Sequence, residues 1–519
     1  MHVWHAGGAQ HTLSVQGLHP HTCACAAACR CRNPEACPGN GSNTCAAGYK
    51  SNLCGVCQWP GWGSSAPFVC RKCWSKTAII VLYVLAGVLM LAVAKLLCFF
   101  SLDFANVVVV ANGAGQAAPA SGQPAQPAPN EVLKPFCIYL QFSFLVASMQ
   151  GLAWPDTLKV PFQALSVLFS SASPQSLGLE CILPRNTRLP VPVQGFLLVM
   201  AMPLLLMVAL VVLETVKAYL ASKRNANSTA GSAFAIEKKR LVAQSIIVCF
   251  LFYPLMLRAV MGLFACITLD QAVSFPYVAK AVGSFWTGDM SQQCWVPGGY
   301  HRIAAFGLGL PLLIILVLIL PAAMLGFILR HRKDLYSDKL RHFSFMFSNY
   351  RPKVAWWEVV VLLQTATLVA ISVFGFGLGT YYSCLALTAG LAGTMVLHAW
   401  MRPYASMEAG RTSLRGLACV TFTSFAALSF LPVGTVYGQL AVNQAYAITA
   451  GAFVLIVNTV YIVSVAVQLV RAIRWTAIVQ MVRKMLGLCC GGRCAQQREQ
   501  QAPAMPGTVK SGPPVEEVA

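Results

Sequence analysis

The chain has 519 residues, of which 57% are hydrophobic and only 10% are charged, and its formal net charge is +21. These fractions lie far from those of soluble globular domains, so the composition excludes an ordinary soluble protein and indicates a membrane protein. The Lys and Arg residues cluster between apolar runs rather than along one groove. This distribution follows the positive-inside rule and argues against nucleic-acid binding.

Cysteine is concentrated near the start of the chain. Residues 1–22 are rich in His, Gly and Ala without a period, and we expect them to be disordered. They lack the apolar stretch of a secretory signal, so either the first span directs insertion or the sequence begins downstream of the natural N-terminus. Residues 23–76 hold ten of the 21 cysteines and form a predicted cysteine-rich module, with Cys23, Cys25, Cys29, Cys31, Cys37, Cys45, Cys54, Cys57, Cys70 and Cys73.

Two kinds of crosslink are open to this module. Outside the cell its cysteines would form disulfides, which so small a module needs because its apolar core is limited. Inside the cell the pairs Cys54-x2-Cys57 and Cys70-x2-Cys73 would be typical of a zinc ribbon. The acceptor sequence at Asn40 is a candidate glycosylation site and favours the outside. We therefore predict an ectodomain with disulfides and no metal, and zinc remains the alternative.

Apolar runs dominate the rest of the chain. The first predicted transmembrane helix covers residues 77–100, enough for ~30 Å of hydrocarbon. A Pro/Ala/Gln-rich linker follows at residues 101–134. Residues 135–470 contain eight further runs, Phe136–Ala153, Val191–Leu213, Leu241–Ile267, Ile303–Leu329, Val354–Phe374, Thr380–Trp400, Leu414–Leu431 and Ala445–Val470. We predict an all-α polytopic membrane protein of about nine transmembrane helices, with a small disulfide-rich N-terminal module.

The basic residues orient these helices. One set of alternating loops holds 22 Lys and Arg, seven of them in Arg330–Lys353, and the other set holds five. The positive-inside rule places the basic set in the cytosol, with the N-terminus outside and the C-terminus inside. One local signal disagrees, because the basic residues Arg71, Lys72 and Lys76 directly before the first run would place the cysteine-rich module in the cytosol. The run Phe136–Ala153 has the weakest transmembrane signal. If it did not cross the membrane, every segment before it would lie on the opposite side.

The C-terminal region suggests contact with lipid. Residues 471–494 alternate basic and apolar positions, as in an amphipathic juxtamembrane helix on anionic inner-leaflet lipids. Cys489, Cys490 and Cys494 are candidates for palmitoylation. Residues 495–519 are expected to be a disordered tail.

Several residues within or between the runs are candidate functional positions. Cys181 and Cys294 are the only cysteines of the two long outer loops, and we predict a disulfide between them. Arg258 lies deep in the fourth run, where a charge needs a partner. Glu214 and Glu358 are candidate partners, and the backbone carbonyls freed by Pro254 are an alternative.

No catalytic pattern is present. The sequence contains no Walker loop, no HExxH and no nucleophile elbow, so we expect no enzyme, no catalytic residues and no cofactor. The lipid bilayer is the expected partner. An extracellular ligand and an oligomeric state are left open.

Short motifs in chain order suggest a family. They are CAAGYKSNLCGVC, YLQFSFLVASMQGLAWP, LECIL, GDMSQQC, GLGLPLLIILVLILP, YRPKVAWWEVVVLLQ and MRPY. With these motifs the chain resembles algal and protist TRP-like multi-span membrane proteins that carry an ephrin-receptor-like or EGF-like cysteine-rich ectodomain. The resemblance implies a cation channel or channel-related sensor in plasma or ciliary membrane.

The resemblance has a departure that bears on conduction. Only five residues, Gly375–Gly379, connect two late runs, and Pro432–Gln444 contains no filter-like sequence. This departure favours the alternative of a cell-surface receptor or adhesion protein without a pore. A small-solute transporter is the third reading, although the inverted repeats it would require are not detected.

Overall fold

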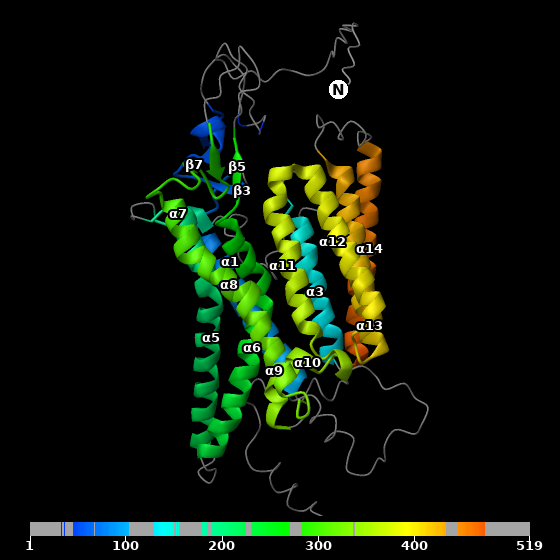
Figure 1. Cartoon of the computed structure of the whole chain (residues 1–519). Coiled ribbons are helices and arrows are strands. Elements are labelled where there is room, and N and C mark those ends of the chain that lie inside the picture. The colour runs from blue at the N-terminus through cyan, green and yellow to red at the C-terminus, as the bar shows by residue number, and fades with distance from the viewer. Residues whose placement is uncertain are drawn as a thin grey trace, which may run out of the picture.

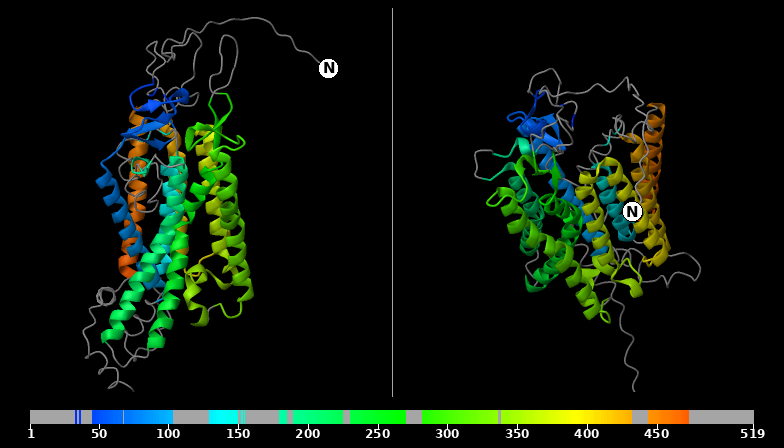
Figure 2. Two further views of the ribbon diagram at one scale, coloured as in Figure 1. Left: turned by 90° about the vertical axis from the view of Figure 1, so that its left-hand side faces the viewer. Right: turned by 45° about the horizontal axis from the view of Figure 1, so that its top comes forward.

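A computed structural model describes residues 33, 36, 45–66, 68–102, 129–149, 152, 154, 179–184, 189–224, 230–269, 282–335, 338–431 and 444–472. In this part of the chain, long helices run side by side and short strands gather at one end of them (Figures 1 and 2). The helices are α1 (Lys76–Leu102), α3 (Pro129–Ala147), α5 (Val191–Arg224), α6 (Ala230–Gly262), α7 (Tyr300–Ala304), α8 (Leu310–Ile314), α9 (Leu320–Arg330), α10 (Ser344–Phe347), α11 (Trp357–Phe374), α12 (Thr380–Met401), α13 (Met407–Ala426) and α14 (Gln444–Ala472).

Eight helical segments of the described chain are long and apolar enough to cross a membrane, which fits a multi-pass membrane protein. They are Lys76–Leu102, Val191–Lys217, Lys239–Gly262, Tyr300–Arg330, Trp357–Phe374, Thr380–Met401, Met407–Phe430 and Ile448–Ala472. Each corresponds to one predicted run. The predicted run with no counterpart among the eight is Phe136–Ala153.

Helix α3 occupies the place of that run. It packs against α1, α11, α13 and α14, and most of its side chains are buried, including the polar Lys134, Gln141 and Ser143. Its weak apolar signal follows from this position, because a helix surrounded by protein can carry polar groups that lipid would not accept. The chain nevertheless passes from one end of the bundle to the other here. Asn130 contacts Asn349 at one end, and the Trp154 ring lies 5.2 Å from the tilted Phe430 ring toward the other.

The segment from α7 to α9 is one continuous helix with two wide turns. Residues Ala305–Gly309 and Ile315–Ile319 form π-helical turns, each ending just before the short stretch that carries Pro311 or Pro321. Proline has no backbone N–H and clashes with the preceding turn, so a locally widened helix accommodates it. The apolar stretch GLGLPLLIILVLILP therefore lies within one unbroken helix, Tyr300–Arg330.

Seven short strands form three antiparallel sheets at one end. They are β1 (Tyr49–Lys50) with β2 (Val56–Cys57), β3 (Trp62–Ala66) with β4 (Val69–Lys72), and β5 (Cys266–Thr268), β6 (Ser284–Trp286) and β7 (Asp289–Gln293) in sequence order. None of these strands was predicted, either in the module or between α6 and α7. The fourth apolar run was predicted to end at Ile267, whereas α6 ends at Gly262 and the chain then forms strand β5.

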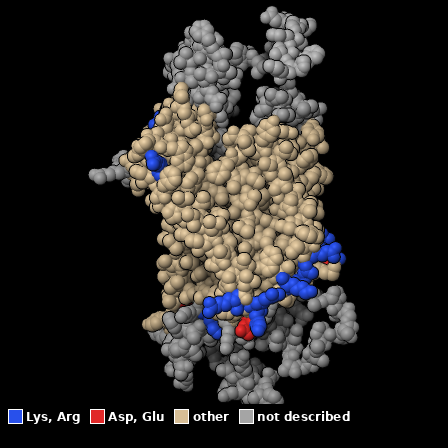
Figure 3. Space-filling view, viewed as in Figure 1, with Lys and Arg blue, Asp and Glu red and all other residues tan. Residues whose placement is uncertain are grey.

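The two ends of the bundle differ in charge. We call the end with residues 45–66, 68–72, 266–269 and 282–294 the strand end, and the opposite end, with residues 330–335, 338–353 and 402–415, the basic end. Figure 3 shows a band of Lys and Arg across the basic end and a smaller group at the strand end, with an almost uncharged surface between them. Arg71 and Lys72 of β4 are exposed residues of the strand end.

Candidate functional site

The cysteine-rich module is crosslinked within itself and to the helix bundle. Within the module, Cys45 is bonded to Cys54 and Cys57 to Cys70. Its last cysteine, Cys73, bonds Cys181, which lies 108 residues later, just before α5. The four cysteines of the zinc-ribbon spacing thus enter three different disulfides, so the disulfide reading of the described cysteines is confirmed. The zinc arrangement is not formed.

The predicted Cys181–Cys294 disulfide is wrong. Cys294 is bonded to Cys266, and Cys181 to Cys73. The prediction failed because Cys266 was counted inside a transmembrane run, whereas α6 ends four residues before it. Cys73 was assigned to the module alone, although the module folds down onto the segment that contains Cys181.

The module packs closely beside its disulfide to the bundle. The backbone N–H of Ser64 donates to Oε2 of Glu180 at 3.1 Å. A Cβ atom added at Gly63 would lie 2.9 Å from the sulfur of Cys181, so β3 approaches this disulfide as closely as a residue without a side chain allows. These contacts fix the orientation of the module as well as its distance.

A second contact joins the module to the sheet between α6 and α7. Phe68 of the module is buried in one apolar cluster with side chains of that sheet, namely Ile267, Leu269, Phe285 and Met290. The Asn52 side-chain amide donates to the backbone carbonyl of Met290 at 3.3 Å. Beside this contact lies a hollow of about 620 Å³, lined by Asn52 and by residues between Val282 and Gly299.

Glu214 pairs with Lys95, a partner that the sequence did not indicate. Its carboxylate forms an ion pair with the Lys95 ammonium of α1 and accepts a hydrogen bond from the Gln244 side chain of α6 at 3.0 Å. Three neighbouring helices thereby satisfy a carboxylate that would be costly to leave alone in a bilayer. Glu214 is therefore not a partner of Arg258.

Arg258 has polar and aromatic neighbours instead of an acid. Its guanidinium donates to the hydroxyl of Ser148, at the end of α3, and lies 5.6 Å from the ring centre of Phe144. Among the described residues no carboxylate forms an ion pair with it. Neither candidate acid, Glu214 or Glu358, is its partner, because each forms an ion pair with a lysine instead.

The most buried charged cluster lies at the basic end. Lys134 of α3 is 1% exposed, and its ammonium lies 2.7 Å from Oε2 of Glu358 on α11 and 2.7 Å from the backbone carbonyl of Phe345. The hydroxyl of Tyr350 donates to the same Glu358 oxygen at 2.7 Å. Burial, and then the Glu358 carboxylate, raise the pKa of Tyr350 well above its ordinary value, so the phenol keeps its proton.

Two motifs that are far apart in sequence meet next to this cluster. The segment YRPK supplies Tyr350 and MRPY supplies Tyr404; the two residues form an antiparallel bridge, and their rings lie 5.2 Å apart. The backbone N–H of Arg351 donates to the Pro403 carbonyl at 2.9 Å, and its guanidinium donates to the Met401 carbonyl. Lys134 faces the Phe345 and Tyr350 rings at 4.6 and 5.0 Å. The basic end is therefore a packed junction of α3, α10, α11 and the α12–α13 connection.

A further polar group ties α3 to the C-terminal helices. The side chain of Asn458 accepts from the Tyr139 hydroxyl at 2.6 Å and donates to the Thr423 hydroxyl at 2.9 Å. Asn458 thus bridges α3, α13 and α14 by hydrogen bonds.

Some predicted positions lie outside the described residues. They are the glycosylation candidate Asn40, the first five cysteines of the module (Cys23, Cys25, Cys29, Cys31 and Cys37), the palmitoylation candidates Cys489, Cys490 and Cys494, and nearly all of the juxtamembrane segment 471–494. These predictions stay as stated.

Comparison with known proteins adds no identification. No protein-family description, no curated protein and no solved structure matches the chain. The resemblance to TRP-like proteins therefore stays a prediction.

Proposed function

We propose that the protein is a cell-surface sensor with its strand end outside the cell and its basic end in the cytosol. Two independent features support this orientation. Disulfides persist in oxidising compartments, and those of the described chain lie at the strand end. The band of Lys and Arg lies at the opposite end, as the positive-inside rule requires of the cytosolic side (Figure 3).

The observation that carries the proposal is the attachment of the module at three places. Its own chain continues into α1, the Cys73–Cys181 disulfide holds it to the segment before α5, and the cluster around Phe68 holds it to the sheet between α6 and α7. A passive stalk would need the first link alone. With all three, a ligand or a force that tilts the module acts on the outer ends of several helices at once. The hollow beside Asn52 is a place where such a ligand would fit.

An ion-conducting version of this sensor is the second candidate. Arg258 favours it, because an intramembrane guanidinium whose described neighbours include no acid is a common mark of an ion or substrate path. Without conduction, the same architecture is a receptor or adhesion protein. Current recordings from cells that display the protein at the surface separate the two versions.

The coupling itself can be measured by hydrogen exchange in lipid nanodiscs. An antibody fragment raised against residues 45–72 should alter amide exchange in the membrane helices α5 and α6 as well as in the module. Replacing Cys73 and Cys181 by Ser should weaken the distant effect. The matched control replaces Cys45 and Cys54, a disulfide internal to the module, and should preserve the distant effect. Protection confined to the module in the unmodified protein would refute the proposal.

The orientation has its own test. An epitope tag placed before residue 45 should be accessible on intact cells, and a tag after residue 472 should be accessible only after permeabilisation. The reverse pattern would refute the assignment of the two ends.

A further inference from the structure

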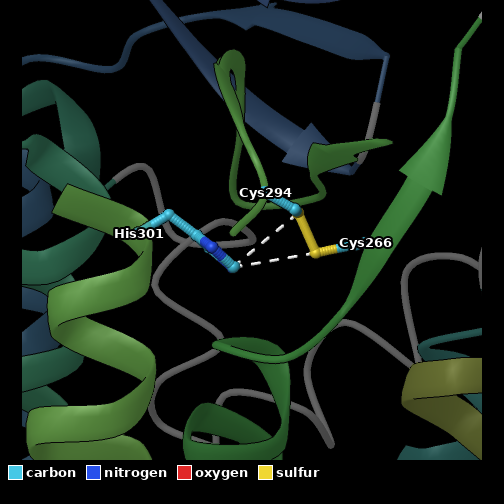
Figure 4. A group of neighbouring side chains, drawn as sticks. All are labelled: Cys266, Cys294 and His301. Atoms are coloured by element: carbon cyan, nitrogen blue, oxygen red, sulfur yellow. Dashed lines mark hydrogen bonds between the residues drawn. A yellow bond between two sulfur atoms is a disulfide. The ribbon is translucent and has the colours of Figure 1, made fainter. Parts of the chain in front are cut away.

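A histidine lies against a disulfide at the strand end. His301, in the first turn of α7, places Nε2 3.7 Å from the sulfur of Cys266 and 3.8 Å from the sulfur of Cys294 (Figure 4). The three potential ligand atoms lie within 4.8 Å of one another. They come from three separate places in the chain: the start of β5, the residue after β7, and α7. Among the described residues this is the one group of three or more His, Cys, Asp or Glu side chains so arranged.

The surroundings hold the imidazole in place. His301 is 1% exposed, and its Nε2 lies 2.9 Å from the Leu263 carbonyl, which implies a proton on that nitrogen. The rings of Trp286 and Trp295 lie 5.4 and 4.9 Å away. Trp286 is itself fixed, because its indole N–H donates to the Gly262 carbonyl at 2.8 Å. A buried imidazole beside two sulfurs, within an aromatic shell, is arranged like a ligand of a soft metal ion.

We propose that reduction of the Cys266–Cys294 disulfide turns this cluster into a Zn²⁺ site, with two thiolates and the His301 imidazole as ligands. A dithiol reductant supplies two electrons and becomes a disulfide, while the protein gains two thiols. Zn²⁺ then displaces one proton from each thiol and binds the neutral imidazole. Cys266 is the more exposed of the two cysteines, so its sulfur is the one that an attacking thiolate reaches first.

The distances fit a tetrahedral ion with little movement. Zinc bonds of ~2.3 Å to sulfur and ~2.0–2.1 Å to nitrogen place a sulfur and a nitrogen ligand about 3.6 Å apart, and two sulfur ligands about 3.8 Å apart. Nε2 already lies near the first distance from both sulfurs. Only the two sulfur atoms must move apart, from the length of a covalent bond to about 3.8 Å. The fourth position would stay open to water.

Metal binding breaks two hydrogen bonds of the imidazole, the one from Nε2 to the Leu263 carbonyl and the one that Nδ1 accepts from the Trp295 backbone N–H. Nε2 must give up its contact with the Leu263 carbonyl, and the proton must move to Nδ1, which now accepts a long 3.4 Å hydrogen bond from the Trp295 backbone N–H. The disulfide and the zinc-bound state therefore favour opposite imidazole tautomers. The site acts as a redox switch, closed to metal when oxidised and open when reduced.

Thiol protection measured peptide by peptide tests the proposal. The full-length protein in nanodiscs is reduced with a phosphine, freed of reductant, and alkylated with and without Zn²⁺. Mass spectrometry then reads the peptides of Cys266 and Cys294 separately from those of the other cysteines. We expect saturating Zn²⁺ to abolish labelling of both cysteines. Equal labelling with and without Zn²⁺ would overturn the proposal, whatever the variants do.

Three histidine variants test the third ligand. His301→Ala should restore labelling in the presence of Zn²⁺, and His301→Cys, which offers a thiolate in place of the imidazole, should keep the protection. His331→Ala, at the basic end, is the matched control and should behave as the unmodified protein. Intact Cys266–Cys294 pairing in oxidised His301→Ala shows that the variant folds. Full Zn²⁺ protection in that variant would overturn the role of His301.

Discussion

Breaking the buried ion pair at the basic end should destabilise the protein strongly. Glu358→Gln keeps the size of the side chain but removes the negative charge that faces the Lys134 ammonium at 2.7 Å. Because Lys134 is 1% exposed, water cannot replace the lost partner. Removal of one member of a buried pair costs about 3–5 kcal/mol of unfolding free energy. Tyr350→Phe, which removes one hydrogen bond to the carboxylate, should cost about 1.5–3 kcal/mol.

Denaturant unfolding in mixed micelles, followed by tryptophan fluorescence, measures these changes. The double variant Lys134→Met, Glu358→Gln should lose less than the sum of its single variants, by about 0.5–3 kcal/mol, because neither charge is then left alone. Glu408→Gln is the matched control, since Glu408 pairs with Arg411 at 3.1 Å on the surface, where the side chains are 46% and 58% exposed. It should change stability by less than about 1 kcal/mol. Equal effects of Glu358→Gln and Glu408→Gln would refute the reasoning, as would additive single variants.

Three further outcomes are expected. Gly416→Ala would place a Cβ 2.6 Å from the Tyr461 hydroxyl and should lower the unfolding free energy by about 1–3 kcal/mol. Gly393→Ala, whose Cβ would have no atom within 4 Å, is the control and should not destabilise its helix. Equal unfolding free energies of the two variants would contradict the packing. Asn458→Leu should lower unfolding free energy by about 0.6–2 kcal/mol, measured in the same assay, and no change would show that its hydrogen bonds contribute nothing. Non-reducing peptide mapping should recover the four disulfides in the pairing described above, and a peptide joining Cys181 to Cys294 would contradict it.

The apolar helices could be predicted because lipid imposes a strong and simple composition on them. Tyr300–Arg330 is unmistakable in the sequence, since few of its residues are buried inside the protein and its surface must therefore be apolar. Helix α3 gives a weak signal for the opposite reason. Its neighbours shield it, so Lys134 and Gln141 are tolerated and reduce its hydropathy. Lys134 was even assigned to the linker.

The partners of charged and sulfur-containing side chains could not be predicted in the same way. The sequence singled out Glu214, Glu358 and Arg258 as unusual, but their neighbours depend on how the helices pack. The disulfides depend on the docking of the module, which brings Cys73 to Cys181 across 108 residues. The sheet that contains Cys266 was missed because its first strand, CIT, is as apolar as the helix before it.

The segment Arg330–Lys353 has a structural role in addition to its charge. If it only oriented the helices, its side chains would all be free to face water, as those of Arg330, Arg332 and Lys333 do. Its second half instead buries Phe345, Phe347 and Tyr350. Phe345 packs on Phe250 of α6 and beside Lys134 of α3, and Tyr350 donates to Glu358 of α11.

The two roles can therefore be separated by substitution. Neutralising the three exposed bases, Arg330, Arg332 and Lys333, perturbs the charge that directs insertion and leaves the buried contacts intact. Tyr350→Phe leaves every charge in place and removes the hydrogen bond to Glu358, whose carboxylate joins the loop to α3 through Lys134. Because α7, α8 and α9 form one continuous helix and this loop links the end of α9 to the start of α11, a tilt of α7 at the strand end would reach α3 through the Glu358 cluster. If the protein is the sensor proposed above, the buried cluster, rather than the surface charge, is the part of the basic end through which helix movement reaches α3.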